Sequence, residues 1–184
     1  MMNKPSKVLY DAPWVQAAIG RLCDVLFAMR DYFEGTAIVG IRTRGAVLAG
    51  RIAEEVRRRT GARPPLGALD ITLYRDDLYS TRHLPAVRST DIAFNVDGTK
   101  ILLVDDVLYT GRTVRAALDE LADFGRPRWI QLAVLVDRGR HELPIRADYA
   151  AAQIDVPDSQ FVRVHLAEVD GVDEVVLIDK GYKE

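Results

Sequence analysis

The chain has 184 residues, of which 48% are hydrophobic and 28% charged, and its formal net charge is −2. This length suits one domain over residues 1–184. The positive and negative charges nearly balance and the pI is near 6.0, which excludes a protein that binds nucleic acid over its whole surface. Cys23 is the only cysteine, which excludes an internal disulfide and a multi-thiolate metal site and favours the reducing cytoplasm. The polar N-terminal residues and the absence of a long apolar run predict neither a signal peptide nor a membrane span.

The first part of the chain alternates helical patterns with short apolar segments. Pro13 opens an amphipathic helix predicted over 13–33, and the apolar residues 37–41 follow as a strand. A second helix is predicted over 47–60. Residues 66–74 have the β-branched and aromatic content of a further strand.

The second part continues the alternation and then changes. A buried strand is predicted over 101–106, a helix over 111–124 and another strand over 129–137. Apolar strands separated by helices are typical of a parallel sheet covered on both faces, so the fold class is α/β. The segments 161–169 and 174–179 lie close together in the chain and predict a terminal hairpin.

Residues 75–98 have many charges and little periodicity, although they lie between two predicted strands. An irregular stretch of this length inside a compact domain is usually functional. We therefore expect a mobile flap over the sheet edge where ligands bind.

The sequence ILLVDDVLYTGRT, residues 101–113, carries the main chemical signal. Asp105 and Asp106 stand at the predicted carboxyl end of a strand, where parallel sheets bind ligands. The next residues turn into a helix, whose free amides favour a phosphate, and Gly111 permits a tight turn. Since acids facing a phosphate would repel it, we expect the acids to accept hydrogen bonds from sugar hydroxyls or metal-bound water. The phosphate side would consist of the amides, the hydroxyls of Thr110 and Thr113, and Arg112.

Three alternatives for this motif are weaker. A Walker-B strand would need a GxxxxGK[ST] loop, which the chain lacks. A phosphoacceptor site of receiver type would not need the Thr-Gly-Arg-Thr turn. A purely structural strand end would not account for a phosphate turn directly after the two acids.

The motif resembles the phosphoribosyl pyrophosphate (PRPP) signature of the type I phosphoribosyltransferases. Three further stretches, at 40–45, 69–78 and 132–149, are similar in the same order to the bifunctional pyrimidine operon attenuation regulators and uracil phosphoribosyltransferases (PyrR type). The similarity runs from the first helix to the terminal hairpin. It implies the type I phosphoribosyltransferase fold, a central parallel sheet flanked by helices, with a flap at about 75–98 and a small hood at about 137–165.

The resemblance implies the reaction of uracil with PRPP to give UMP and pyrophosphate. Asp105 and Asp106 would hold the ribose hydroxyls, and the loop after strand 37–41 would hold the pyrophosphate, with Arg44 as a third catalytic residue. An ordinary strand-to-helix turn is the alternative for that loop. Magnesium would arrive with PRPP, so no protein metal ligands are expected. The implied PRPP and nucleotide contacts are Thr43, Arg44, Gly45, Arg75, Arg88, Asp105, Asp106, Val107, Leu108, Tyr109, Thr110, Gly111, Arg112 and Thr113.

Base recognition is expected in the hood. Arg138 would form one wall of the uracil site, and Val162 is a second candidate on a neighbouring strand. Asp137 is either an ion partner of Arg138 or part of the site. Arg75 and Arg88 of the flap are equally open, because a solvated surface arginine would have the same sequence pattern.

The resemblance also implies a regulatory function, in which a homodimer or larger homo-oligomer binds leader mRNA when UMP is present. The candidate RNA contacts are Arg21, Arg42, Arg140, His141 and Arg146. Gly20, Cys23, Ala152 and Asp155 depart from the polar and basic pattern of the RNA-binding members. The alternative is therefore a non-regulatory phosphoribosyltransferase of base salvage. Hypoxanthine or guanine is the alternative base, because the expected hood contacts are mainly backbone.

Overall fold

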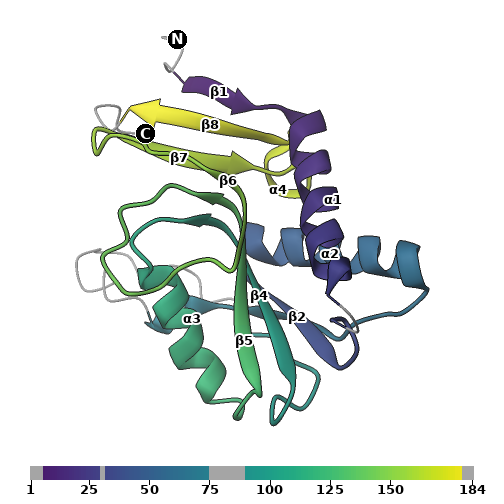
Figure 1. Ribbon diagram of the computed structural model, residues 1–184. Helices are drawn as coiled ribbons and strands as arrows, with labels where there is room; N and C mark the ends of the chain where they lie inside the picture. Colours follow the sequence, from purple (N-terminus) through teal and green to yellow (C-terminus); the bar gives the residue numbers. More distant parts are fainter. Residues whose placement is uncertain (1–5, 30–31, 75–89, 180–184) are drawn as a thin grey trace.

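The computed structural model describes residues 6–29, 32–74 and 90–179 (Figure 1). Two sheets form its framework, one of five strands and one of three. Residues 75–89 of the predicted flap lie outside the described residues. This segment includes Arg75 and Arg88. In the described ranges no helix combines the length and the apolar character that crossing a membrane requires.

The larger sheet is parallel throughout and has the strand order β3-β2-β4-β5-β6. The chain thus goes from β2 outward to β3, returns across β2 to β4, and then continues in the other direction. Such a reversal of strand order marks the carboxyl ends of β2 and β4 as the expected ligand site. The strands are β2 (Thr36–Ile41), β3 (Leu66–Leu69), β4 (Lys100–Leu108), β5 (Trp129–Asp137) and β6 (Tyr149–Gln153).

Helices cover both faces of this sheet, as the apolar strands predicted. Along β4, Leu102 and Val104 pack with α1 (Ala12–Ala28) and α2 (Arg44–Thr60). The alternate residues Ile101 and Leu103 pack with α3 (Arg112–Ala122) on the opposite face. Since successive side chains of a strand point to opposite faces, one uninterrupted apolar strand fills two cores.

The helix boundaries follow local capping. The side chain of Asp11 accepts a hydrogen bond from the Trp14 amide and caps α1, which ends at Ala28, so the predicted extension to residue 33 is wrong. Helix α2 begins at Arg44, three residues before the prediction, and ends at Thr60, where Gly61 caps it in the left-handed conformation. Helix α3 is close to its predicted range.

The smaller sheet is antiparallel, with the order β1-β8-β7. It contains β1 (Ser6–Tyr10), β7 (Gln160–His165) and β8 (Glu174–Asp179), and the short helix α4 (Ala167–Asp170) connects β7 to β8. This confirms the predicted terminal hairpin, but its first strand ends at His165 because the chain turns into α4. Strands β1 and β6 were not predicted, since five-residue segments carry little periodicity.

The predicted strand over 66–74 is wrong in its second half. Strand β3 ends at Leu69, and residues Ile71–Tyr74 form a 3₁₀ helix. The Asp70 side chain accepts a hydrogen bond from the Thr72 amide at 3.0 Å, which favours a turn over an extended chain. Within the described end of the predicted flap, the backbones of Asp91 and Ala68 exchange two hydrogen bonds of 2.8 Å, so this part of the flap runs beside β3.

Candidate active site

Asp105 and Asp106 lie within the last part of β4, not at its end. Strand β4 pairs with β5 as far as Leu108, which lies beside Asp137. Because of this pairing, β4 continues for two residues after the acids. Asp105 is only 5% exposed, whereas Asp106 is partly buried. The prediction that the strand ends with the acid pair is therefore wrong, although both acids remain near the carboxyl edge of the sheet.

The two carboxylates are held by the backbone that follows them. The Asp106 amide donates to Asp105 Oδ1 at 2.9 Å, and the Val107 amide donates to Asp106 Oδ1 at 3.0 Å. Each carboxylate keeps further lone pairs for hydroxyl donors. Burial raises the pKa of both carboxyls, the neighbouring Asp106 charge raises the pKa of Asp105 further, and the positive charge of Arg44 opposes the rise at Asp106.

The loop after β2 lies directly against these acids. A Cβ atom on Gly45 would be 2.5 Å from the Val104 carbonyl oxygen and 3.3 Å from Asp105 Oδ1. Only glycine allows this approach of two backbones. The peptide bond between Arg42 and Thr43 is cis, and Thr43 and Arg44 follow at the start of α2. The predicted pyrophosphate loop and the predicted ribose acids are therefore neighbours in space.

The predicted phosphate turn precedes α3. Gly111 has a φ of +89° and stands just before the first helical residue, Arg112. The Thr110 carbonyl accepts hydrogen bonds from the amides of Glu142 at 3.0 Å and Leu143 at 3.2 Å. Arg112 forms an ion pair with Glu142 on the exposed side. Residues 142–143 thus hold Thr110 and Arg112 in place. The free amides at the start of α3 suit an anion.

Arg138 follows β5 and is 2% exposed. Its guanidinium carbon lies 3.8 Å from the centre of the Tyr109 ring, and Nη2 is 3.4 Å from the Val156 carbonyl oxygen. Its Nε is buried and lacks a partner in the described part of the chain. A buried guanidinium that stacks on the phosphate turn and keeps an unused donor is suited to contact a ligand.

Comparison with known proteins identifies the family. The model of the Phosphoribosyl transferase domain matches residues 7–168. A Bifunctional protein PyrR of Deinococcus deserti is 49% identical over 178 residues, 97% of each chain. The Bifunctional protein PyrR of Thermus aquaticus is 51% identical over 172 residues, which cover 94% of this chain and 95% of that one. The chain belongs to the PyrR family of phosphoribosyl transferases.

Solved structures confirm the predicted type I phosphoribosyltransferase fold. A hypoxanthine phosphoribosyltransferase of Trypanosoma cruzi, in a ternary complex with substrates, has a TM-score of 0.71 at 16% identity and 97% coverage of both chains. A hypoxanthine-guanine phosphoribosyltransferase of Bacillus anthracis has a TM-score of 0.68 at 16% identity, with 94% of this chain and 98% of that chain covered. At this level of identity the likeness concerns the fold alone.

In this PyrR-family chain, the two predicted base-binding residues have different surroundings. Arg138 lies beside the phosphate turn, whereas Val162 on β7 is 9% exposed and packs in the core. Asp137 is not the ion partner of Arg138. Its Oδ1 accepts from the Gly139 amide at 2.8 Å and contacts His141 Nε2 at 2.9 Å. Consecutive side chains at a strand end point in opposite directions, which separates Asp137 from Arg138.

The predicted RNA contacts do not form one cluster. Three of them, Arg140, His141 and Arg146, line a pocket of about 620 Å³ together with Arg138 and Asp155. Arg140 is also paired with Asp155 and Asp158, each at 3.2 Å.

The other two candidates lie elsewhere. Arg21 stands over the Trp14 ring and lines a separate pocket next to Tyr149. Arg42 follows β2, where its amide donates to the Leu69 carbonyl.

The acids at this site fit a metal that arrives with its substrate. Within the described ranges, no three His, Cys, Asp or Glu side chains are grouped so that they could hold a metal ion. Mg²⁺ commonly keeps several waters and binds one or two carboxylates together with substrate phosphates. Asp105 and Asp106 lie near the predicted phosphate sites and could accept hydrogen bonds from such waters.

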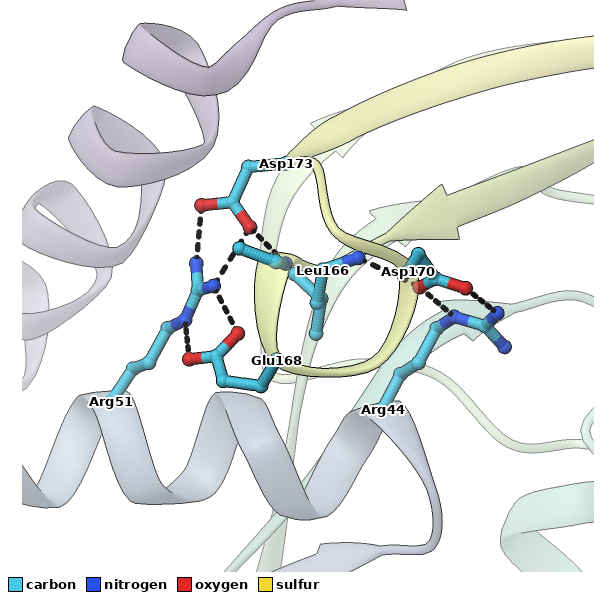
Figure 2. A network of polar contacts seen from close by, with 7 residues as sticks. Arg44, Arg51, Leu166, Glu168, Asp170 and Asp173 are labelled. Carbon is cyan, nitrogen blue, oxygen red and sulfur yellow. Dashed lines mark hydrogen bonds and ion pairs between the residues drawn. The ribbon is translucent and has the colours of Figure 1, made fainter.

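A polar network above the start of α2 was not predicted (Figure 2). It joins Arg44 to Asp170 and joins Arg51 to both Glu168 and Asp173. The acids come from α4 and from the turn that follows it, more than 110 residues later in the chain. Helical spacing alone gives no signal of such a long-range contact. The only signal in the sequence is that residues 168–173, at the predicted hairpin turn, contain three acids, which could have suggested an interaction site.

Proposed function

We propose that the protein is a uracil phosphoribosyltransferase, which converts uracil and PRPP to UMP and pyrophosphate, and that it also regulates pyrimidine operon transcripts by UMP-dependent binding of leader mRNA. Membership of the PyrR family supports both activities. The contact of Gly45 with Asp105 is the observation that carries the enzymatic activity, because it brings the loop for one end of PRPP against the acids for its ribose.

In this mechanism the protein positions the substrates and neutralises charge. N1 of uracil forms a bond with C1 of the ribose while the bond from C1 to pyrophosphate breaks, through a transition state with oxocarbenium character. The N1 proton of uracil is released to the leaving pyrophosphate or to water. Asp105 and Asp106 accept hydrogen bonds from the ribose hydroxyls, and residues 109–113 bind the 5-phosphate. Arg44 and the amides of residues 43–45 stabilise the leaving pyrophosphate. Asp105 and Asp106 would hold, through bound waters, the magnesium carried with PRPP, which would neutralise phosphate charge.

The base site is assigned to the hood, residues 137–165. Arg138 is fixed by its stack on Tyr109 and keeps a donor for a uracil carbonyl. Val162 remains a candidate for apolar contact with the base. Arg75 and Arg88 of the flap, residues 75–98, are proposed to bind phosphate when PRPP is present, and flap closure would exclude water from the reacting carbon.

The regulatory activity is assigned to the surface around the 620 Å³ pocket. Arg140, His141 and Arg146 meet there, and a flipped RNA base with its phosphate would find both a cavity and positive charge.

A non-regulatory salvage enzyme is the second candidate, since Asp155 and Asp158 already pair with Arg140. A gel-shift titration with the leader RNA of the protein's own operon, with and without UMP, separates the two. A UMP-dependent shift supports the regulator, and its absence eliminates it.

The remaining proposals concern organisation. A single functional domain over residues 1–184 includes the flap and the hood, and a cytoplasmic homodimer or larger homo-oligomer would meet both PRPP and nascent transcripts. Sedimentation of the purified protein measures the oligomeric state.

The enzymatic proposal is tested by identifying UMP and pyrophosphate after incubation with uracil, PRPP and Mg²⁺. The same assay is then made with Asp106→Asn, which removes a charged acceptor. We expect kcat/KM to fall by about 10- to 100-fold. No turnover by the parent protein would eliminate the enzyme, and an unaffected variant would eliminate the assignment of Asp106.

A further inference from the structure

Arg44 is held by Asp170 in a side-on ion pair. Its Nε lies 3.0 Å from Asp170 Oδ2, and its Nη2 lies 2.7 Å from Asp170 Oδ1. The third guanidinium nitrogen, Nη1, points away from Asp170 and has no hydrogen-bond partner in the described part of the chain (Figure 2). One edge of the guanidinium is therefore fixed, while the donors on Nη1 are available to a ligand.

Asp170 is itself fixed by the backbone of its own turn. The Leu166 amide donates to Asp170 Oδ2 at 2.9 Å, and Gly171, with a φ of +78°, ends α4 directly after it. Hydrogen bonding from Arg44 lowers the pKa of the Asp170 carboxyl, so it stays ionised at neutral pH. The carboxylate is therefore held both by the backbone of its own turn and by Arg44.

Arg51 clamps the same turn to α2 at a second point. It stands seven residues after Arg44, or about two helical turns. Its Nε donates to Glu168 Oε1 at 2.9 Å, and its two terminal nitrogens each lie 2.7 Å from an oxygen of Asp173. Asp173 also accepts from the Ala167 amide at 2.7 Å. Figure 2 shows the two arginines side by side along α2, each against a different part of the turn.

The hydrogen bond with Asp170 is the main cause that raises the pKa of Arg44, and the charge of Asp106 adds to the rise. Arg44 is therefore also within electrostatic range of the ribose acids. A free arginine side chain would lose much rotamer freedom on binding a phosphate. The pair with Asp170 removes most of that freedom before the ligand arrives. Such preorganisation strengthens binding without adding a contact to the ligand.

We propose that Asp170 is a positioning residue for the pyrophosphate end of PRPP. It holds the guanidinium of Arg44 so that Nη1 donates to a pyrophosphate oxygen, and it does not touch the substrate itself. This inference rests on the proposed function, which assigns Arg44 to the pyrophosphate. The opposite role is a latch, in which Asp170 competes with pyrophosphate for Arg44 and weakens its binding.

The test compares Asp170→Asn with the matched control Asp173→Asn. Both variants lose an arginine partner and weaken an amide contact in the same turn, but the control leaves Arg44 untouched. For Asp170→Asn we expect the Kd of magnesium pyrophosphate, measured by calorimetry, and the KM of PRPP to rise about tenfold. The KM of uracil should stay within about twofold of the parent value. For Asp173→Asn we expect PRPP and pyrophosphate affinities within about twofold of the parent, with a comparable fall in Tm.

Unchanged or tighter pyrophosphate binding by Asp170→Asn would overturn the inference, and tighter binding would establish the latch. Equal losses in Asp170→Asn and Asp173→Asn would also overturn it, because they would show a merely structural role for the turn. Arg44→Gln separates the positioning role of Asp170 from the binding role of Arg44. If Arg44→Gln weakens pyrophosphate binding and Asp170→Asn does not, only the positioning role fails. If neither variant weakens it, the assignment of Arg44 to pyrophosphate fails as well.

Discussion

Gly45 and Asp105 lie in direct contact, and a Cβ atom on Gly45 would be 3.1 Å from Asp105 Cα and 3.3 Å from its Oδ1. The contact joins the loop after β2 to the middle of the acid motif on β4. Strand β4 is fixed by its parallel pairing with β2, and Gly45 stands in the first turn of α2 against its backbone. The distance between the two halves of the site is therefore set by the absence of a side chain at position 45. This relationship makes glycine necessary at position 45.

We therefore expect Gly45→Ala to lower kcat/KM for PRPP by about 10- to 100-fold, since a displacement of about 1 Å misplaces reacting groups to that degree. The variant should also be less stable in urea denaturation. Gly50→Ala is the matched control in the same helix, because a Cβ there has no heavy atom within 4 Å. Alanine at position 50 should stabilise α2 by up to about 1 kcal/mol and leave the kinetics unchanged. Equal activity of the two variants would contradict the close contact.

Replacement of Asp105 by asparagine should separate stability from activity. Burial and the Asp106 charge raise the pKa of Asp105, so on raising the pH the unfolded chain releases this proton before the folded protein does. The folded protein then loses stability as pH rises from the ordinary Asp value near 4 to the raised value. Asp105→Asn removes that loss, and we expect it to be about 1–3 kcal/mol more stable than the parent at neutral pH.

The difference should shrink as the pH is lowered to about 4 and below, where the folded and the unfolded chain both carry the proton. Chemical denaturation over a pH series measures it, and kcat/KM should fall in the same variant because a ribose acceptor is lost. A stability difference that grows on acidification would contradict the raised pKa.

The stack of Arg138 on Tyr109 should control base affinity. Tyr109→Phe keeps the aromatic face, and we expect the KM of uracil to stay within about twofold of the parent. Tyr109→Ala removes the surface against which the guanidinium lies, and the KM of uracil should rise about tenfold. Steady-state kinetics at saturating PRPP measure both variants. Identical uracil KM values for Phe and Ala would show that the stack does not position Arg138.

Asp155 should weaken RNA binding in two ways, by pairing with Arg140 and by placing a negative charge beside the 620 Å³ pocket. Asp155→Asn is expected to tighten UMP-dependent binding of leader RNA by about 3- to 10-fold at fixed low salt. Asp119→Asn, which changes an exposed acid on α3, is a charge-matched control. Filter binding at stated salt concentrations measures both. An equal gain in both variants would indicate a general charge effect, and no gain would remove Asp155 from the interface.

The sequence predicted those parts of the fold that depend on local pattern. The uninterrupted apolar residues of β4 and β5 indicated a parallel sheet with two covered faces, and the acid and glycine motif located its carboxyl edge. Gly111 was expected to make a tight turn, and it adopts a positive φ before α3.

The parts that sequence reasoning missed depend on long-range packing. Strand β4 extends past Asp106 because β5 pairs with it, and Asp137 turns to His141 because of strand geometry. Strand β1 carries too few residues for a period and gains its partners only from β8. The contact of Arg44 with Asp170 joins residues 126 positions apart, so no spacing rule could predict it.

The central claim is that this site transfers ribose 5-phosphate to uracil. Its most direct test is the rate of pyrophosphate release from PRPP and Mg²⁺ with uracil, hypoxanthine or guanine as the base, with the nucleotide product identified. We predict UMP as the product and a kcat/KM for uracil at least about 100-fold above that for either purine, the scale on which matched polar contacts discriminate. No release with uracil, or faster turnover of a purine, would contradict the proposed activity.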